Sequence, residues 1–336
     1  MKENKRNNYL DILICISCFA IIMIHTTERL IYNNYLIINI LYSISRFSIP
    51  IIIMVLGSIL LDNKYKYNIN NIYKLFILFI LWSLVYSIYN NLYLPYTLYG
   101  NIDYKNFILE IFTGPSHFFL FSVILCLYGF LPILRKLINK ENKEEVELLI
   151  LLLVVIIFLL PGIVKVLEYY FLDIGFLKLL KNSALSILLG SYILYFILGW
   201  YLNNYEVKKI YVYILGIIGI IYSSYILPID FKIVRYEYDY TSISVLFLSM
   251  MVYILIKSIF SKKEINNKII KSISKYSIGI YIIHVIIIDI LYLYITSNIV
   301  VIYIITFGLS YLISFIISNI KVNQKLYNAY TNNGEG

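Results

Sequence analysis

Apolar runs of about 20 residues, separated by short polar stretches, make up most of this chain. An α-helix needs roughly that length to cross the hydrocarbon core of a membrane. We therefore expect an all-α fold, with residues 1–336 forming one polytopic bundle of about ten transmembrane helices. The expected spans are residues 9–29, 36–61, 74–94, 116–135, 146–164, 183–203, 209–228, 241–260, 276–295 and 299–319.

The composition supports a membrane protein. Hydrophobic residues make up 61% of the chain and charged residues only 14%, against roughly 25% charged in soluble domains. The net charge of +9 does not indicate a nucleic-acid partner, because the basic residues are spread over short loops between apolar runs. We expect membrane lipid as a partner and no nucleic acid, and the oligomeric state is left open.

The distribution of Lys and Arg predicts the orientation of the bundle. Cytoplasmic loops of membrane proteins carry an excess of these residues. With the N-terminus inside, 20 of the 28 basic residues fall in inner segments and 7 in outer segments, and Arg46 lies within a span. We therefore expect cytoplasmic N- and C-termini in a multi-pass protein of the cell membrane.

All three histidines of the chain fall in or at expected spans. Asp11, Cys18 and His25 are seven residues apart, so they follow one stripe of the first span. His25 and His117 are expected at a similar depth in the outer half, and His284 near the middle of the ninth span. A histidine among apolar residues is often structural, but several in one membrane protein favour a functional site.

Arg46 is expected near the middle of the second span, where a charged side chain costs roughly 2.5–3.5 kcal/mol to insert. One explanation is a buried ion pair with Asp289 or Asp11. The other, which we favour, is a chamber that holds an anionic group or an oxyanion. Pro50 and Gly57 lie close to the same stripe, and both residue types are typical of helices beside a ligand.

Metal chemistry is not expected. Cys15 and Cys18 have the spacing of a metal or redox pair, but neither a second cysteine pair nor a nearby histidine completes a zinc site. Buried free cysteine usually packs as a small hydrophobic residue.

Five short motifs resemble the acyltransferase-3 family of integral membrane acyltransferases. They occur in the family's order, on the expected spans, and cover essentially the whole chain. They are Arg6…Leu10-Asp11…Ala20…His25, Arg46-Phe47-Ser48-Ile49-Pro50 with Gly57, Gly114-Pro115-Ser116-His117-Phe118-Phe119 with Tyr128 and Pro132, Tyr195–Tyr201, and Ser277–His284.

The chain departs from the family pattern at two places. Many members carry an arginine three residues after the aspartate, where this chain has Ile14. A tryptophan is common after the histidine of the third motif, where this chain has Phe118 and Phe119. The first departure leaves open whether Ile14 alters the activity.

The resemblance implies transfer of an acyl group, usually acetyl from acetyl-CoA, to a hydroxyl of a cell-surface or lipid-linked glycan. His25 would then act as general base, since its pKa suits proton transfer near neutral pH. Arg46 would stabilise negative charge on the reacting carbonyl oxygen or bind a donor phosphate, and Asp11 belongs to the same catalytic set.

Further contacts follow from the same resemblance. The residues expected to bind the substrate are His117, His284, Ser48 and Tyr281, although the two histidines could also orient other groups. The nucleotide end of acetyl-CoA, or of another acyl-CoA, is expected near Lys64, Lys66, Arg135 and Lys136. These four residues could also serve only as topology signals.

Two other functions are compatible with parts of the pattern. A transporter or exporter of lipid-linked glycan would also need polar residues in its spans, but transporters often show inverted repeats, and none is evident here. A membrane scaffold would have little use for three intramembrane histidines and an arginine.

Overall fold

The computed structural model describes residues 8–33, 36–62, 67–95, 104–160, 190–226, 240, 242–263 and 267–319, and within these ranges all regular secondary structure is helical. The elements are α1 (Asn8–Thr27), η1 (Glu28–Asn33), α2 (Leu36–Ser45), α3 (Ser48–Leu60), α4 (Asn70–Ser87), η2 (Ile88–Tyr93), α6 (Tyr104–Thr113), η3 (Ser116–Phe118), α7 (Phe119–Leu137), α8 (Lys143–Leu153), η4 (Val154–Leu159), α12 (Gly190–Asn204), α13 (Lys209–Ile226), α15 (Ile243–Phe260), α16 (Lys268–Tyr294) and α17 (Ile299–Asn319). The expected all-α class is confirmed.

Seven helical stretches in the described ranges are long and apolar enough to cross a membrane. They coincide with seven of the ten expected spans, although the fourth is longer than expected and runs over Tyr104–Leu137. The other three expected spans fall on α8 with η4, on α12 and on α13, and residues 161–164, 183–189 and 227–228 of those spans lie outside the described residues. The count of ten and the orientation therefore stay predictions.

The outward-facing side chains of the bundle are apolar. On α13, Ile214, Ile218 and Ile221 recur on one exposed face, and Phe76, Ile77 and Leu81 do the same on α4. A soluble protein rarely exposes contiguous apolar surface of this kind. The exposed faces are therefore the surfaces that contact lipid.

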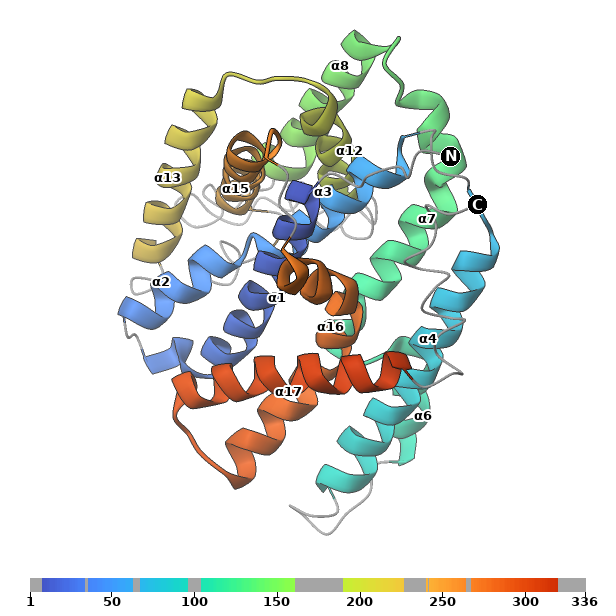
Figure 1. The fold of residues 1–336 in the computed structure, drawn as a ribbon, viewed down its shortest axis with the longest axis vertical. Helices are drawn as coiled ribbons and strands as arrows, with labels where there is room; N and C mark the ends of the chain where they lie inside the picture. Colours follow the sequence, from blue (N-terminus) through green and yellow to red (C-terminus); the bar gives the residue numbers. More distant parts are fainter. Residues whose placement is uncertain are drawn as a thin grey trace, which may run out of the picture.

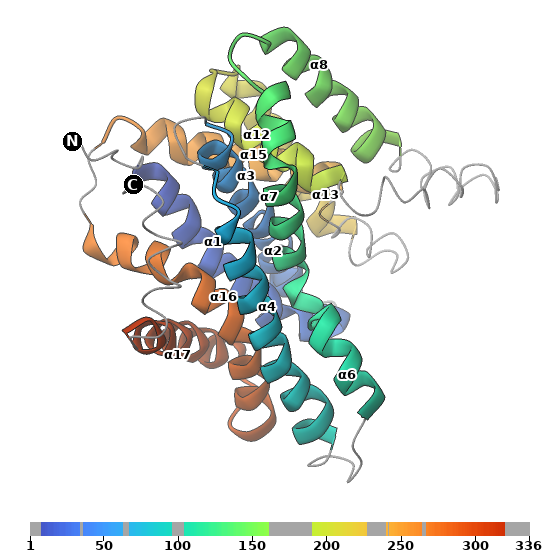
Figure 2. The same cartoon turned by 90° about the vertical axis from the view of Figure 1, so that its right-hand side faces the viewer.

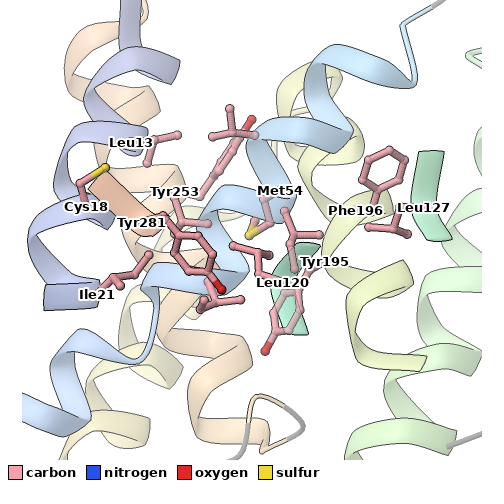
Figure 3. Packing of buried hydrophobic residues seen from close by; sticks show 14 of the residues in the cluster. Leu13, Cys18, Ile21, Met54, Leu120, Leu127, Tyr195, Phe196, Tyr253 and Tyr281 are labelled. Carbon is pink, nitrogen blue, oxygen red and sulfur yellow. The ribbon is translucent and has the colours of Figure 1, made fainter. Parts of the chain in front are cut away.

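α1 lies in the middle of the bundle (Figure 1) and packs against α2, α3, α15, α16 and α17. Figure 3 shows how its inner face meets the other helices. Leu13, Cys18 and Ile21 of α1 lie in one core with Met54 of α3 and Tyr281 of α16. On the opposite side of this core, α4 runs beside α7 and α6 (Figure 2). The last turn of α1, which carries His25, is thereby held between several helices.

The expected second span is interrupted at Arg46 and Phe47, so that α2 ends at Ser45 and α3 begins at Ser48. Pro50 explains the break, because it has no N–H to donate to the carbonyl of Arg46, four residues earlier. Regular bonding resumes with the amide of Ile51, which donates to the carbonyl of Phe47 at 2.9 Å. The break places Arg46 at a helix end within the bundle.

Two glycines allow α3 and α12 to touch along their backbones. A Cβ on Gly57 would lie 1.8 Å from the carbonyl oxygen of Phe196, and a Cβ on Gly199 would lie 1.8 Å from that of Met54. Neither backbone atom can move aside without separating the helices. Close approach of this kind through small residues is a common way for transmembrane helices to pack.

We expect Gly57→Ala and Gly199→Ala each to lower the free energy of unfolding by about 1–3 kcal/mol, the usual cost of overpacking. Thermal unfolding of the purified protein in detergent measures the effect. Gly129→Ala is the matched control: a Cβ there has no atom within 4 Å, so it should be neutral or stabilising by up to about 1 kcal/mol. Equal behaviour of the three variants would contradict the proposed contact.

Candidate active site

Three histidines from three parts of the chain meet in one cluster. His25 comes from the last turn of α1, His117 from η3 and His284 from α16. The ring centroids of His25 and His284 are 5.0 Å apart, those of His117 and His284 are 6.2 Å apart, and those of His25 and His117 are 6.4 Å apart. The sequence placed all three in spans; the structure brings them together.

The chain before α7 is shaped to deliver His117 to this cluster. Gly114 has a φ of 72°, a conformation that side chains disfavour, and a Cβ there would also meet the ring of Phe79 at 2.8 Å. Pro115 follows in an extended conformation and caps η3. The buried His117 is therefore set by a turn that needs glycine.

Two tyrosines hold the backbone around the histidines. The Tyr281 hydroxyl donates a hydrogen bond to the backbone carbonyl of His117. The Tyr86 hydroxyl donates to the carbonyl of Ile282 at 2.6 Å, and the Tyr86 ring packs against the imidazole of His117 with centroids 4.5 Å apart. α4, η3 and α16 are thus joined by hydrogen bonds beside the cluster.

The hydrogen bond of His284 fixes which ring nitrogen carries its proton. Nδ1 lies 2.6 Å from the backbone carbonyl oxygen of Tyr281. A carbonyl can only accept, so Nδ1 must be the donor, and in the neutral imidazole Nε2 then holds the lone pair. Nε2 of His284 is buried and has no hydrogen-bond partner among the described residues, and the same is true of Nε2 of His117.

His25 is oriented by Glu28, a residue that the sequence analysis did not select. The Nδ1 atom of His25 lies 3.3 Å from Oε2 of Glu28. A carboxylate accepts the proton of Nδ1 and leaves Nε2 of His25 as the proton acceptor, the arrangement that orients histidine bases in many enzymes. The signal was present in the sequence, since the two residues are three apart and lie on one helical face.

Arg46 lies between two tyrosine rings. Its guanidinium carbon is 4.1 Å from the ring centroid of Tyr240 and 5.4 Å from that of Tyr42. Nη1 lies 3.4 Å from the hydroxyl oxygens of both tyrosines. Aromatic faces attract a cation and tolerate its partial removal from water, which explains how the buried Arg46 is accommodated at the break between α2 and α3.

Arg46 and the His25–Glu28 pair belong to neighbouring elements. His25 lies in the last turn of α1, Glu28 begins η1, and Arg46 follows α2, which packs against α1. A base that can take a proton and a cation that can hold an anion are the two groups that deprotonation of a hydroxyl and attack on a carbonyl require.

The carboxylates considered as partners of Arg46 make other contacts. Asp289 forms an ion pair with Arg29, whose guanidinium lies 4.7 Å from the ring centroid of Tyr292. Asp11 accepts a hydrogen bond from Ser274 at 2.7 Å. Asp11 lies fourteen residues before His25 on α1, about 21 Å along the axis, so the structure does not bring it to the histidine cluster.

The remaining selected residues lie apart from the cluster or outside the described ranges. Arg135 donates from Nε to the carbonyl of Leu60 at 2.8 Å and so caps the end of α3. Lys136 is exposed, and Lys64 and Lys66 lie outside the described residues. Ser48 is fully buried, and its hydroxyl has no partner within the described ranges.

No group of His, Cys, Asp and Glu side chains suited to a metal ion was found in the part of the chain that the structure describes. Cys15 and Cys18 are buried free cysteines.

Comparison with known proteins identifies a family. The model of the acyltransferase-3 family, described as an acyltransferase domain, matches residues 7–319. No curated protein and no solved structure is significantly similar to the chain.

We expect Tyr281→Phe to lower the free energy of unfolding by about 1–3 kcal/mol, because it leaves the buried carbonyl of His117 without its donor. Thermal unfolding in detergent measures this loss. Tyr73→Phe is the control, since Tyr73 is exposed and should be neutral. A Tyr281→Phe protein as stable as this control would show that the hydroxyl does not hold His117.

Proposed function

Because the chain belongs to the acyltransferase-3 family, we propose that it transfers an acyl group, acetyl in the simplest case, from acyl-CoA to a hydroxyl of a cell-surface or lipid-linked glycan. The family supports a membrane acyltransferase. The donor, the acceptor and the roles of individual residues are our proposal, and the meeting of three imidazoles from α1, η3 and α16 is the observation that carries it.

The reaction begins at His25. Its Nε2 atom removes the proton of the acceptor hydroxyl while the hydroxyl oxygen attacks the thioester carbonyl. Glu28 stabilises the imidazolium that forms, as carboxylates do in histidine-dependent acyl transfer. The tetrahedral oxyanion is stabilised by the guanidinium of Arg46. When it collapses, the C–S bond breaks, and the departing thiolate of CoA takes the proton back from His25.

His117 and His284 lie beside His25. Each offers a buried Nε2 atom without a protein partner in the described ranges, and a buried polar atom left unpaired costs roughly 1–3 kcal/mol. A substrate that hydrogen-bonds to these atoms recovers that cost. We assign both histidines to substrate contacts. Tyr281 positions His117 through the hydrogen bond to its backbone carbonyl.

The donor approaches from the cytoplasm, where acyl-CoA is found. The distribution of Lys and Arg predicts which loops of the protein face the cytoplasmic side of the cell membrane. Lys64, Lys66 and Lys136 are proposed to bind its phosphates. Arg135 already donates to the carbonyl of Leu60 through Nε, so only its other nitrogens are available to a phosphate. Ser48 and Arg46 lie at the break between α2 and α3, away from the start of α2.

We expect His25→Gln to reduce acyl transfer about 10²–10⁴-fold, the usual contribution of a general base, while the protein still inserts and folds. Transfer of radiolabelled acetyl from acetyl-CoA to the glycans of membranes that contain the protein measures the rate. Folding is checked by gel filtration and thermal unfolding. Unchanged transfer by this variant would remove His25 as the base.

Glu28→Gln tests the positioning of His25. The amide oxygen still accepts a hydrogen bond from Nδ1 but lacks the charge that stabilises the imidazolium, so we expect kcat to fall about tenfold or more with little change in the KM for acetyl-CoA. Glu144→Gln is the control, because Glu144 lies exposed in the first turn of α8. If both variants keep the wild-type kcat, Glu28 has no such role.

A further inference from the structure

α2 buries a polar face and exposes an apolar one. Leu36, Ile37, Leu41 and Ile44 are exposed on the lipid side. The buried stripe at spacings of three and four consists of Asn39, Tyr42, Ser43 and Arg46. We call these four residues the α2 polar face. A helix in a membrane turns such a face toward protein or a polar ligand, because lipid cannot satisfy it.

At the end of this face nearer to α3, Tyr42 and Arg46 make contacts with each other and with a further tyrosine. Tyr42 contacts Arg46 directly, and Arg46 also contacts Tyr240. At the other end, Asn39 and Ser43 lack such contacts among the described residues. Asn39 is 0% exposed and Ser43 is 1% exposed, yet both amide atoms of Asn39 and the hydroxyl of Ser43 have no hydrogen-bond partner in the described ranges.

The neighbouring polar groups do not serve Asn39 and Ser43. α2 packs against α1 and α13. On α1, Thr26 and Thr27 donate to carbonyls of their own helix. Three buried atoms that can donate or accept are therefore left without a partner in the described ranges. Leaving such atoms unpaired is costly, which points to a polar ligand.

The α2 polar face begins near the start of α2. Asn39 lies three residues after the start of α2 and His25 two residues before the end of α1, and α1 packs against α2. Along the chain of helical residues, the face extends about 10 Å from Asn39 to Arg46.

We propose that Asn39 and Ser43 form the acceptor subsite, which binds the hydroxyl groups of an uncharged sugar residue and presents one of them to His25. An amide and a hydroxyl both donate and accept, as the neighbouring hydroxyls of a sugar require, and neither carries a charge. Tyr42 and Tyr240 supply aromatic faces at the end nearer to α3. This inference rests on the proposed function and names the acceptor side of the same site.

The first experiment tests whether polar molecules reach this face from outside. In a variant whose native cysteines are replaced by alanine, Ser43→Cys and Ile44→Cys are compared in intact cells. Both are treated with 2-(trimethylammonium)ethyl methanethiosulfonate, a charged reagent that does not cross membranes. We expect Ser43→Cys to react at least about tenfold faster, because Ile44 lies on the apolar, exposed face of the same helix. Equal or absent labelling would overturn the subsite.

The second experiment tests what binds there. Asn39→Leu keeps the number and branching of the side-chain heavy atoms and removes the unpaired amide, so a purely structural role predicts unchanged transfer and equal or higher thermal stability. The acceptor role predicts the same stability but an at least tenfold loss of O-acetyl groups on surface glycans, measured as acetate released by alkali. Binding of radiolabelled acetyl-CoA to the purified protein should stay within twofold of the wild type.

Thr306→Val is the matched control. Thr306 of α17 is also fully buried with an unpaired hydroxyl among the described residues, and its replacement should change neither O-acetylation nor donor binding. Loss of acetyl-CoA binding in Asn39→Leu would assign the face to the donor and overturn the proposal, as would unchanged O-acetylation. Absence of O-acetyl groups with the wild-type protein would instead overturn the proposed function, and the labelling result would still show whether the face is open.

Discussion

The structure depends on how polar side chains are accommodated inside an apolar bundle. Each buried imidazole, guanidinium or amide must find a partner, because neither lipid nor aliphatic side chains can replace water. Arg46 meets this requirement through Tyr42 and Tyr240, and His25 through Glu28. Nε2 of His117 and Nε2 of His284 do not meet it within the described ranges, which makes these two atoms the exceptions in the cluster.

The contacts of α1 also bear on the topology. The start of α1 meets the start of α16 through Asp11 and Ser274, and its end meets the later part of α16 through His25 and His284. The two helices therefore run in the same direction, which requires an odd number of crossings between them. Four of the long apolar stretches lie between them in sequence. One or three further crossings would satisfy this condition, and α8 with η4, α12 and α13 are the candidates for them, so the count of ten spans stays a prediction.

The sequence predicted the helical class and seven of the spans, because long apolar runs leave strong signals. It also singled out the three histidines that the structure brings together, because such residues are costly inside a membrane. It did not predict the break at Arg46, although Pro50 marked it, since one proline often only bends a transmembrane helix. Glu28 was missed because an acidic residue at a membrane surface is usually just solvated. The contact between Arg46 and Tyr240 joins residues 194 positions apart, and no local pattern in a single sequence encodes such a pair.

The two ends of the α2 polar face differ in whether the chain provides partners for their polar groups. Around Arg46 the chain provides its own partners, so the cation is held whether or not substrate is present. Around Asn39 and Ser43 it provides none in the described ranges, although an apolar pair would pack there at lower cost. Sequences generally keep a locally unfavourable choice where function requires it. The proposed transferase uses both arrangements. A cation held in place suits the oxyanion, because its negative charge develops at the same position in every turnover. Unpaired neutral groups suit the acceptor, because the acceptor must bind and then leave.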